Sequence, residues 1–482
     1  MSVSARGVVG PVCKDEREGG KGHAMDARTM VPAALVLAGV AWAAAVASAA
    51  AAPQACTYRR FTVQEVDGHV VATTPQPEVT PPRWARDVSQ EPADWSGGPD
   101  ADGPFFKNPI PFVIPPKDDG EPFYRHNHQP AITWCASGDL LAIWYSTVSE
   151  SGTEMTVLAS RLRRGRDAWD PSSEFFKAAH RNMTGSSLLH DGKGTLYHFN
   201  GMGPKGAKGW GKLALLMRRS TDNGVTWTPA RPISSGEEYA RRHQVIAGTL
   251  MTEGGTLVQP CDATPGGQGA TAIHVSRDGG KTWSDPGGGI RGIHAGVAEL
   301  ADGRLLAFGR GRAVDGRMPM SLSADMGRTW TSKASPFPPI GSGQRLVLKR
   351  LREGPLLFAS FSSGDRRKPE AGRMTVIGPD GKKVIGHGLF AAVSFDDGRS
   401  WPVRRLLAAR PGEYNGGAHT GRFTATTTRA EHGGYLAVTQ TPDGVIHLIS
   451  SRLHYRFNLA WLLEGGATAD GAVPESFRHR MR

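Results

Sequence analysis

Cysteine is scarce in this sequence of 482 residues. There are four cysteines and no Cys-x-x-Cys pair. Cys13 precedes the apolar N-terminal segment described below, which leaves Cys56, Cys135 and Cys261 for a mature chain. So few scattered cysteines exclude a disulfide-built scaffold and argue against a structural zinc site, although one disulfide could form in an oxidising compartment.

Long stretches with apolar residues at helical spacing are also missing beyond the N-terminus. Glycine (62 residues) and proline (34) are abundant, and aromatic residues are spread along the chain. Hydrophobic residues make up 39% of the sequence and charged residues 21%, which is enough apolar material for a well-filled core. This composition favours a globular all-β fold.

A basic stripe is absent as well, even though the formal net charge is +12. The basic residues are dispersed and are not interleaved with aromatic ones, so we predict no nucleic-acid partner. An acidic glycan is a better match for this charge in an exported protein. Nothing in the sequence indicates a nucleotide or redox group, and we predict no cofactor.

The first 52 residues have the features of a signal peptide. Lys21 and Arg28 precede an alanine-rich apolar run over residues 31–52, which contains small residues suited to cleavage. We therefore expect a secreted or periplasmic protein. If translation begins at Met25 or Met30, residues 1–24 are an overcalled start. The run is about 22 residues long, so an uncleaved membrane anchor stays open as an alternative.

One eight-residue phrase occurs four times. The copies are "STDNGVTW" from Ser220, "SRDGGKTW" from Ser276, "SADMGRTW" from Ser323 and "SFDDGRSW" from Ser394. Asp and Ser or Thr side chains can bond the backbone of such a turn, Gly permits positive φ, and Trp covers the hairpin. We predict a structural role for the boxes, because four equivalent copies cannot all surround one catalytic site.

A second series of turns, each followed by a short apolar strand, runs in phase with the boxes. Its six members lie near Gly138, Gly192, Gly254, Gly303, Gly354 and Gly444. With a strand before each turn and a boxed hairpin after it, each unit has about four strands, as in a β-propeller. We predict a six-bladed propeller over residues 123–463, with an insertion near 362–386. Before it we predict a Pro-rich N-terminal extension over 53–122 with one strand near 61–73, and after it a mobile tail over 464–482.

The boxes and phased turns resemble the sialidase-like family of six-bladed propellers with Asp-box (BNR) repeats. The resemblance covers residues 124–462 and is specific for the fold but less so for the reaction. In that family three arginines hold the substrate carboxylate, a Tyr activated by a Glu attacks the anomeric carbon, and an Asp is the acid/base. The resemblance implies a glycoside hydrolase of the exo-α-sialidase type.

Polar residues that begin the innermost strands should converge at the propeller axis. At these junctions we predict a substrate-binding pocket rich in arginine and histidine, which suits an anionic sugar. The substrate-binding candidates are Arg125, His126, His128, Arg181, Arg242, His243, Arg310 and Arg345.

The resemblance assigns individual roles within this pocket. Tyr435 in "GGYLAVTQ" matches the nucleophile, and Arg310 in "LLAFGRGR" matches a carboxylate-binding arginine. His128 stands where the family has another arginine, and His294 where it has the activating glutamate. Histidine can serve as a base at neutral pH but cannot hold a carboxylate as arginine does.

Three assignments stay open at this stage. The third arginine is Arg345 or Arg373, and the acid is Glu150 or Glu154, with Asp262 as a second choice. A metal held by His126 and His128 with a further histidine is an alternative, although we predict no metal site. We predict an exported hydrolase that removes terminal anionic sugars from glycans. The alternatives are a non-catalytic carbohydrate-binding propeller and a His-based lyase or hydrolase that acts on uronic-acid polysaccharides.

Overall fold

The protein is all-β in the part of the chain that the computed structural model describes, which comprises residues 57–66, 69–78, 80–117, 120–233, 243–262 and 270–481. Residues 1–52, the predicted signal segment, lie outside these ranges, as does Arg242. Within them no helix is both long and apolar enough to cross a membrane. The helical elements are α1 (Leu459–Leu463), α2 (Glu475–Arg478), η1 (Arg83–Ala85), η4 (Pro369–Gly372) and η5 (His479–Met481).

Six sheets of four or more strands contain most of the described chain. The first has the order β2-β1-β7-β6-β5-β4, with β1 (Thr57–Val66), β2 (His69–Glu78), β4 (His126–Trp134), β5 (Leu140–Thr147), β6 (Thr156–Leu162) and β7 (Ser173–Ala178). The second has the order β11-β10-β9-β8, with β8 (Ser186–His190), β9 (Leu196–Met202), β10 (Ala214–Ser220) and β11 (Arg231–Pro232). The third has the order β12-β14-β15-β16 with β13 also on β14, and comprises β12 (Gln244–Val245), β13 (Leu250–Met251), β14 (Leu257–Asp262), β15 (Ala270–Ser276) and β16 (Ile290–Arg291).

The remaining sheets come from the second half of the chain and one N-terminal strand. The fourth sheet runs β17 (Ile293–Glu299), β18 (Leu305–Arg310), β19 (Pro319–Ser323), β20 (Thr331–Ala334). The fifth has the order β22-β23-β26-β27-β24-β25, with β22 (Val347–Arg350), β23 (Leu356–Phe361), β24 (Met374–Ile377), β25 (Lys383–Gly386), β26 (Leu389–Ser394) and β27 (Val403–Leu406). The sixth runs β3 (Phe106–Pro111), β33 (Leu453–Phe457), β32 (Ile446–Ile449), β31 (Ala437–Gln440), and two small sheets pair β21 (Gln344–Arg345) with β30 (Gly434–Tyr435) and β28 (Gly412–Asn415) with β29 (Arg422–Ala425).

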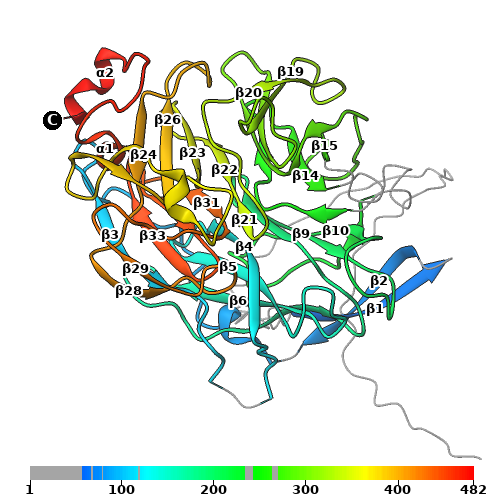
Figure 1. Ribbon diagram of the computed structural model, residues 1–482. Helices are drawn as coiled ribbons and strands as arrows, with labels where there is room; N and C mark the ends of the chain where they lie inside the picture. The colour runs from blue at the N-terminus through cyan, green and yellow to red at the C-terminus, as the bar shows by residue number, and fades with distance from the viewer. Residues whose placement is uncertain are drawn as a thin grey trace, which may run out of the picture. The chain divides into compact units, whose positions relative to one another are not determined.

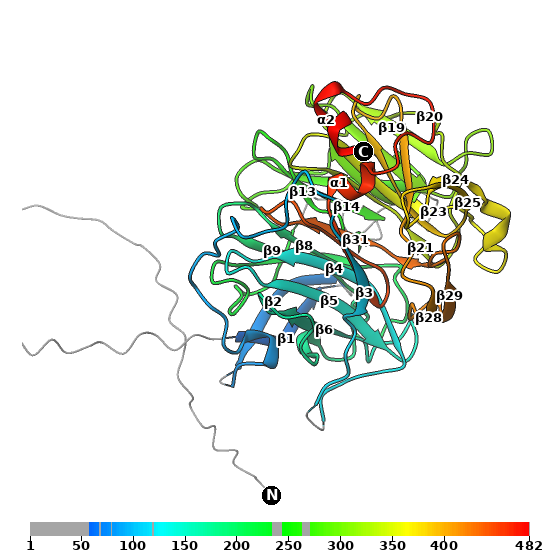
Figure 2. The same ribbon diagram turned by 90° about the vertical axis from the view of Figure 1, so that its left-hand side faces the viewer.

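The inner edges of these sheets meet near the middle of the molecule. β4 contacts both β8 and β31, and β22 contacts both β17 and β31, so the first sheet is next to the last. Figures 1 and 2 both show β31 beside β4, with β21 close by. Residues that begin these strands therefore come together although they are far apart in the sequence.

The middle strands are buried on both faces. All eight residues of β5, "LLAIWYST", are buried because neighbouring sheets cover both sides of this one. A strand in such a position has a continuous apolar run instead of strict alternation. The sheets thus form a rigid support for the side chains at their inner ends.

The four boxes form the structural turns that the sequence predicts. In the first, Asp222 accepts hydrogen bonds from Ser220 Oγ (2.7 Å) and from the backbone N–H of Thr226 (2.9 Å), while Gly224 adopts φ +80°. Trp227 closes the turn by donating its indole N–H to the Gly224 carbonyl at 3.1 Å. The same Ser-to-Asp and Gly-to-Ser bonds occur in the boxes that begin at Ser276, Ser323 and Ser394.

The N-terminal extension differs from the single strand that the sequence predicts. Residues 57–78 form a hairpin of two strands, β1 and β2, and β1 joins the first sheet through parallel pairing with β7. β3 also completes the last sheet by pairing with β33. The insertion in the fifth sheet carries the hairpin β24–β25. The segment after Glu464 includes α2, whereas the sequence predicts a mobile tail.

Candidate active site

A chain of three side chains, here called the Tyr435 triad, joins three strands near the inner ends of the sheets. The Tyr435 hydroxyl lies 3.1 Å from His294 Nε2, and His294 Nδ1 lies 2.8 Å from Asp262 Oδ2. The backbone N–H of His294 also donates to Asp262 Oδ1 at 2.7 Å. This geometry suits an imidazole that carries its proton on Nδ1 and accepts the Tyr435 proton at Nε2.

Backbone strain and burial both act on His294. Its φ is +53°, a region that non-glycine residues seldom adopt, so the surrounding structure holds it there. Burial, together with the charge of Arg310, lowers the pKa of His294 to about 3, despite the opposing effect of Asp262. The imidazole is therefore neutral at physiological pH and free to act as a base.

Two arginines flank the Tyr435 ring. Arg310 Nη1 donates to the Tyr435 hydroxyl and to the Gln344 carbonyl, both at 3.0 Å. The Arg345 guanidinium lies 4.4 Å from the centre of the Tyr435 ring. The parallel pairing of β21 with β30 causes this neighbourhood, because it sets Arg345 opposite Tyr435. Positive charge at these positions attracts an anionic group of a ligand.

Arg345 is fully buried, and none of its three guanidinium nitrogens has a hydrogen-bond partner within the described part of the chain. Burial lowers its pKa to about 10, so the group stays charged at neutral pH. An unpaired buried charge is costly. The unused donors beside Tyr435 therefore indicate the position of an anionic ligand group.

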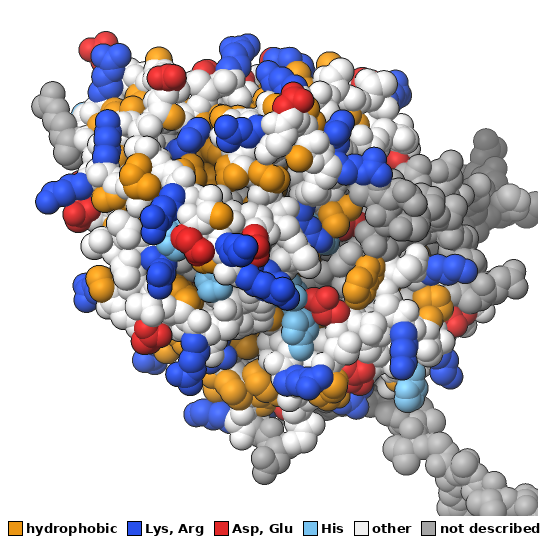
Figure 3. All heavy atoms as spheres, in the orientation of Figure 1, with side chains coloured by type: hydrophobic (Ala, Val, Ile, Leu, Met, Phe, Trp, Pro, Cys, Tyr) orange, Lys and Arg blue, Asp and Glu red, His pale blue; other side chains and the backbone are white. Residues whose placement is uncertain are grey.

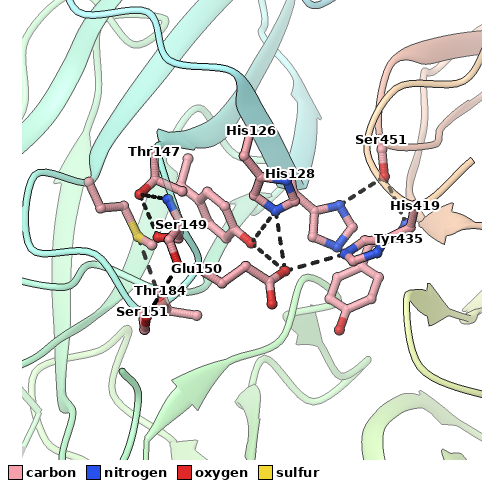
Figure 4. Close-up of polar contacts among 12 residues, drawn as sticks. His126, His128, Thr147, Ser149, Glu150, Ser151, Thr184, His419, Tyr435 and Ser451 are labelled. Carbon is pink, nitrogen blue, oxygen red and sulfur yellow. Dashed lines mark hydrogen bonds and ion pairs between the residues drawn. The ribbon is translucent and has the colours of Figure 1, made fainter. Parts of the chain in front are cut away.

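A second group of side chains, here called the Glu150 cluster, lies on the other side of His128. It consists of Tyr145, His126, His419 and Glu150, whose Oε1 lies 2.9 Å from the Tyr145 hydroxyl and 3.3 Å from each histidine Nε2. Figure 4 shows the contacts from His126 and His419 meeting at one end of Glu150. Burial raises the pKa of Glu150, but the bonds from His126 and His419 outweigh it and hold the pKa far below its usual range. Glu150 is thus a carboxylate that accepts protons in hydrogen bonds and does not deliver one.

His128 connects the Glu150 cluster with the Tyr435 triad. Its ring centre lies 4.0 Å from that of Tyr435 and 4.5 Å from that of His419, and its Nδ1 lies 2.9 Å from Ser451 Oγ. Figure 4 shows His128 and His419 next to Tyr435. Both groups therefore belong to one site.

A cleft of about 580 Å³ opens onto the Glu150 cluster. It is lined by Arg125, His126, Val148, Ser149, Glu150, Ser151, Trp210 and His419. On the face drawn in Figure 3, histidine side chains are exposed near the middle, with basic and acidic side chains beside them. A polar ligand can thus reach the site from solvent.

Seven of the candidates from the sequence come together here: Tyr435, His294, Arg310, Arg345, His128, His126 and Glu150. Arg125 lies at the cleft but uses its Nε to donate to the Val148 carbonyl. For the third arginine, the geometry favours the buried Arg345 over the exposed Arg373.

Other candidates are engaged elsewhere. Arg181 is bound to Glu65 of the N-terminal hairpin and to the Gly203 carbonyl, so its side chain is not among those that meet at Tyr435. Glu154 accepts bonds from Thr147 (2.6 Å) and the backbone N–H of Val148 (2.7 Å), which make it a structural residue of its loop. His243 packs against His274, with ring centres 5.0 Å apart. Arg242 lies outside the described residues.

Sequence reasoning missed three contributions to the site. Asp262 is paired with His294 and is not the free acid that was the second choice. Tyr145 and His419 were not predicted at all. His419 lies between β28 and β29 in the glycine-rich stretch "NGGAHTG". Its backbone has an unusual φ of +67°. The sequence signal that could have identified His419 is a lone histidine among the glycines of this loop.

Comparison with known proteins identifies relatives for most of the chain. Residues 138–448 match the family described as BNR repeat-like domain. A sialidase from Micromonospora viridifaciens is 25% identical over 410 residues, which are 74% of this chain and 54% of that protein. The chain thus spans about half the length of this curated relative.

Solved structures with a similar fold include two whose whole length the chain nearly covers. One is a protein of unknown function from Dyadobacter fermentans, with 15% identity, a TM-score of 0.50, and coverage of 74% of this chain and 99% of that one. The other is the intramolecular trans-sialidase from Ruminococcus gnavus in complex with oseltamivir carboxylate, with 13% identity, a TM-score of 0.50, and coverage of 73% and 97%. At these identities the likeness is one of fold.

Proposed function

The chain belongs to the BNR repeat-like domain family, and we propose that it is a sialidase-like glycoside hydrolase that removes terminal anionic sugars from glycans. We further propose that its six sheets are the blades of one six-bladed propeller with the site at its axis. The observation that carries the function is the Tyr435 hydroxyl, held between His294 and Arg310 and beside the unpaired Arg345. The Micromonospora sialidase supports the same class of reaction.

The Tyr435 triad supplies the nucleophile. In the first step the Tyr435 oxygen bonds to the anomeric carbon, the bond to the leaving oxygen breaks, and the phenol proton passes to His294 Nε2. Asp262 then stabilises the imidazolium through Nδ1, 2.8 Å away. A buried carboxylate behind a histidine base serves this purpose in other hydrolases. Burial keeps His294 neutral beforehand, so the base is ready at physiological pH.

A tyrosine nucleophile suits a sugar that carries a carboxylate at its anomeric carbon. A carboxylate nucleophile would be repelled by that group, whereas a neutral phenol is not. Arg345 has three free donors and Arg310 donates to the Tyr435 oxygen, so the substrate carboxylate and the developing phenolate are both near positive charge.

The leaving oxygen faces the Glu150 cluster. Departure of the leaving oxygen needs a group that stabilises its negative charge. Because Glu150 accepts three hydrogen bonds, we assign this role to the polar groups of the Glu150 cluster together and not to a protonated Glu150. A water in the cleft gives a proton to the leaving oxygen, and in the second step the hydroxide that remains displaces Tyr435 from the anomeric carbon. Tyr435 recovers its own proton from His294. Two displacements retain the anomeric configuration.

The test compares wild type with Tyr435→Phe on a panel of sialosides, uronides and sulfated glycans. Tyr435→Phe keeps the ring contacts but removes the nucleophile, so kcat should fall by about 10³-fold or more. Tyr414→Phe is the matched control, because the Tyr414 hydroxyl bonds Asn108 outside the site. Equal turnover by wild type and Tyr435→Phe would exclude this mechanism. Proton NMR of the first-formed product reports retention.

A uronate lyase is the second candidate, and His294 is the observation that favours it. A neutral histidine beside a tyrosine and two arginines can also remove a proton next to a carboxylate that the arginines neutralise. A lyase leaves an unsaturated sugar that absorbs in the near ultraviolet, whereas a hydrolase does not. If every glycan is bound but left intact, the protein is a carbohydrate-binding propeller without turnover.

We also propose export through residues 31–52, from their apolar composition and small residues. N-terminal sequencing of the protein from the medium or periplasm of a bacterial host should give a chain that starts near Pro53. A chain retained in the membrane fraction with its N-terminus intact would indicate an uncleaved anchor instead.

A further inference from the structure

Two histidines and one carboxylate from three separate segments meet at the mouth of the cleft. His126 comes from β4, Glu150 from the loop between β5 and β6, and His419 from the loop between β28 and β29. Their ligand atoms, the two Nε2 and one carboxylate oxygen, all lie within 4.8 Å of one another. Two imidazoles with one carboxylate are a donor set that zinc and similar divalent metals prefer.

The spacing of these atoms matches a metal's coordination shell. Glu150 Oε1 is 3.3 Å from His126 Nε2 and 3.3 Å from His419 Nε2. In a tetrahedral site with bonds of about 2.0–2.1 Å, neighbouring ligand atoms are about 3.3–3.4 Å apart. Two of the three spacings therefore already fit such a site, and the two Nε2 atoms, which lie within 4.8 Å of each other, complete the set.

The hydrogen bonding at Glu150 is unusual when no ion is considered. Three groups, the Tyr145 hydroxyl and the two Nε2 atoms, all point at the single oxygen Oε1. A carboxylate oxygen has two lone pairs, so three convergent donors exceed its ordinary capacity. A cation among these atoms would replace both Nε2 protons and leave Tyr145 as the donor to Glu150.

The cluster is accessible and yet held in place. The side chains of His126, Glu150 and His419 are 22%, 34% and 23% exposed, and all three line the cleft. His419 is held at its positive φ, and its carbonyl accepts a bond from Arg366. Ligand groups that their strand and loops hold in place need little reorganisation when a metal binds.

We propose that His126, Glu150 and His419 form a binding site for a divalent transition metal, with Zn²⁺ the ion that suits the donor set best. Three protein ligands leave a coordination position open toward the cleft, as in catalytic zinc sites. Metal binding itself does not depend on the proposed hydrolase function. The role of the metal does rest on that function: the bound ion would stabilise the negative charge on the leaving oxygen of the glycan.

The test is direct metal binding by the full chain without an affinity tag. Chelator-treated protein is titrated with Zn²⁺ by calorimetry and with Co²⁺ by visible absorption, whose band intensity distinguishes tetrahedral from octahedral sites. We expect one ion per chain, and binding at least about 100-fold weaker in Glu150→Gln and in His126→Gln/His419→Gln. His479→Gln, which removes an exposed histidine far along the chain, is the control and should bind as wild type does.

Several outcomes decide the proposal. If wild type binds no ion, or if the double variant binds Zn²⁺ as tightly as wild type, the proposal is wrong. Circular dichroism of each variant shows whether it folds; should the double variant fail to fold, Glu150→Gln alone decides. Activity is measured separately with and without metal, so that a protein that binds Zn²⁺ but hydrolyses nothing would overturn the proposed function and leave the metal site intact.

Discussion

Asp262 binds His294 twice, through the side chain and through the backbone. Its Oδ2 lies 2.8 Å from His294 Nδ1, and its Oδ1 accepts the backbone N–H of His294 at 2.7 Å. The same carboxylate also accepts the Thr271 hydroxyl at 3.2 Å. The backbone bond holds the segment of His294 at its φ of +53°, and the nearby carboxylate oxygen favours a proton on Nδ1.

We predict that Asp262→Asn lowers kcat by about 10²–10⁴-fold while KM changes little. An asparagine amide can donate to Nδ1, which moves the imidazole proton to Nε2 and prevents it from accepting the Tyr435 proton. Steady-state kinetics measure the loss, and ¹⁵N NMR of the imidazole reports the tautomer. Asp302→Asn, at an exposed residue paired with Arg304, is the control. An unchanged tautomer together with unchanged kcat would contradict the role of Asp262.

Arg345→Met should stabilise the protein and abolish its recognition of anionic substrates. Replacing an unpaired buried charge with an apolar side chain of similar length removes a desolvation cost of about 1–3 kcal/mol, partly offset by the lost contact with the Tyr435 ring. Urea unfolding measures the gain, and KM for a carboxylated substrate should rise at least about 100-fold. A variant that is less stable and still binds anionic sugars normally would show that Arg345 is structural.

The boxes were predictable from the sequence because their bonds are local. In the first box, for example, Ser220, Asp222 and Thr226 are within six positions of one another, so an eight-residue phrase contains the whole turn. The all-β class followed from the abundant glycine and proline and from the missing helical spacing. His294 and Tyr435 were found because they stand at the starts of inner strands, whose phase the turns set, whereas Arg310 was found through the resemblance to the sialidase-like family.

The rest of the site depends on long-range contacts that no local pattern contains. Arg181 lies shortly before β8, the first strand of the second sheet, but its side chain meets Glu65, more than a hundred positions away, because the extension forms a hairpin there. His419 reaches Glu150 from a loop 269 positions later. The strand register in β4 also shifts between His128 and Ala131, where Gln129 has φ +51°, and period-two reasoning cannot anticipate such a bulge.

Asp222→Ala should destabilise the protein by about 1–2 kcal/mol without any effect on kcat. The carboxylate caps one turn through Ser220 and Thr226 and touches nothing in the Tyr435 triad. Urea unfolding and steady-state kinetics on the same preparation test both parts. Asp222→Asn, which keeps one acceptor oxygen, should lie between wild type and alanine in stability. A drop in kcat at full folding would give the box a direct part in catalysis.

Glu431 should make the protein less stable as the pH rises through neutrality. Burial raises the pKa of this carboxyl from its ordinary 4.5 to about 8, although Tyr455 and Thr420 donate hydrogen bonds to it. Below pH 4.5 the group is protonated in both states and its contribution is complete. Between pH 4.5 and 8 the unfolded chain loses the proton while the folded protein keeps it, so the free energy of unfolding falls by up to about 1.4 kcal/mol per pH unit.

Comparison with Glu431→Gln between pH 6.5 and 8 isolates this effect, because Lys177 and Lys349, whose pKa values burial lowers to about 8, titrate alike in both proteins. The buried His294 and His447 have pKa values of about 3, below their ordinary 6.5, so their contribution to stability grows between pH 3 and 6.5 and is constant above it. Relative to Glu431→Gln, which cannot ionise, wild type should lose about 2 kcal/mol between pH 6.5 and 8. Urea midpoints of both proteins at four pH values in this interval give the difference. Parallel stability curves for the two proteins would mean that Glu431 is already ionised in the folded state.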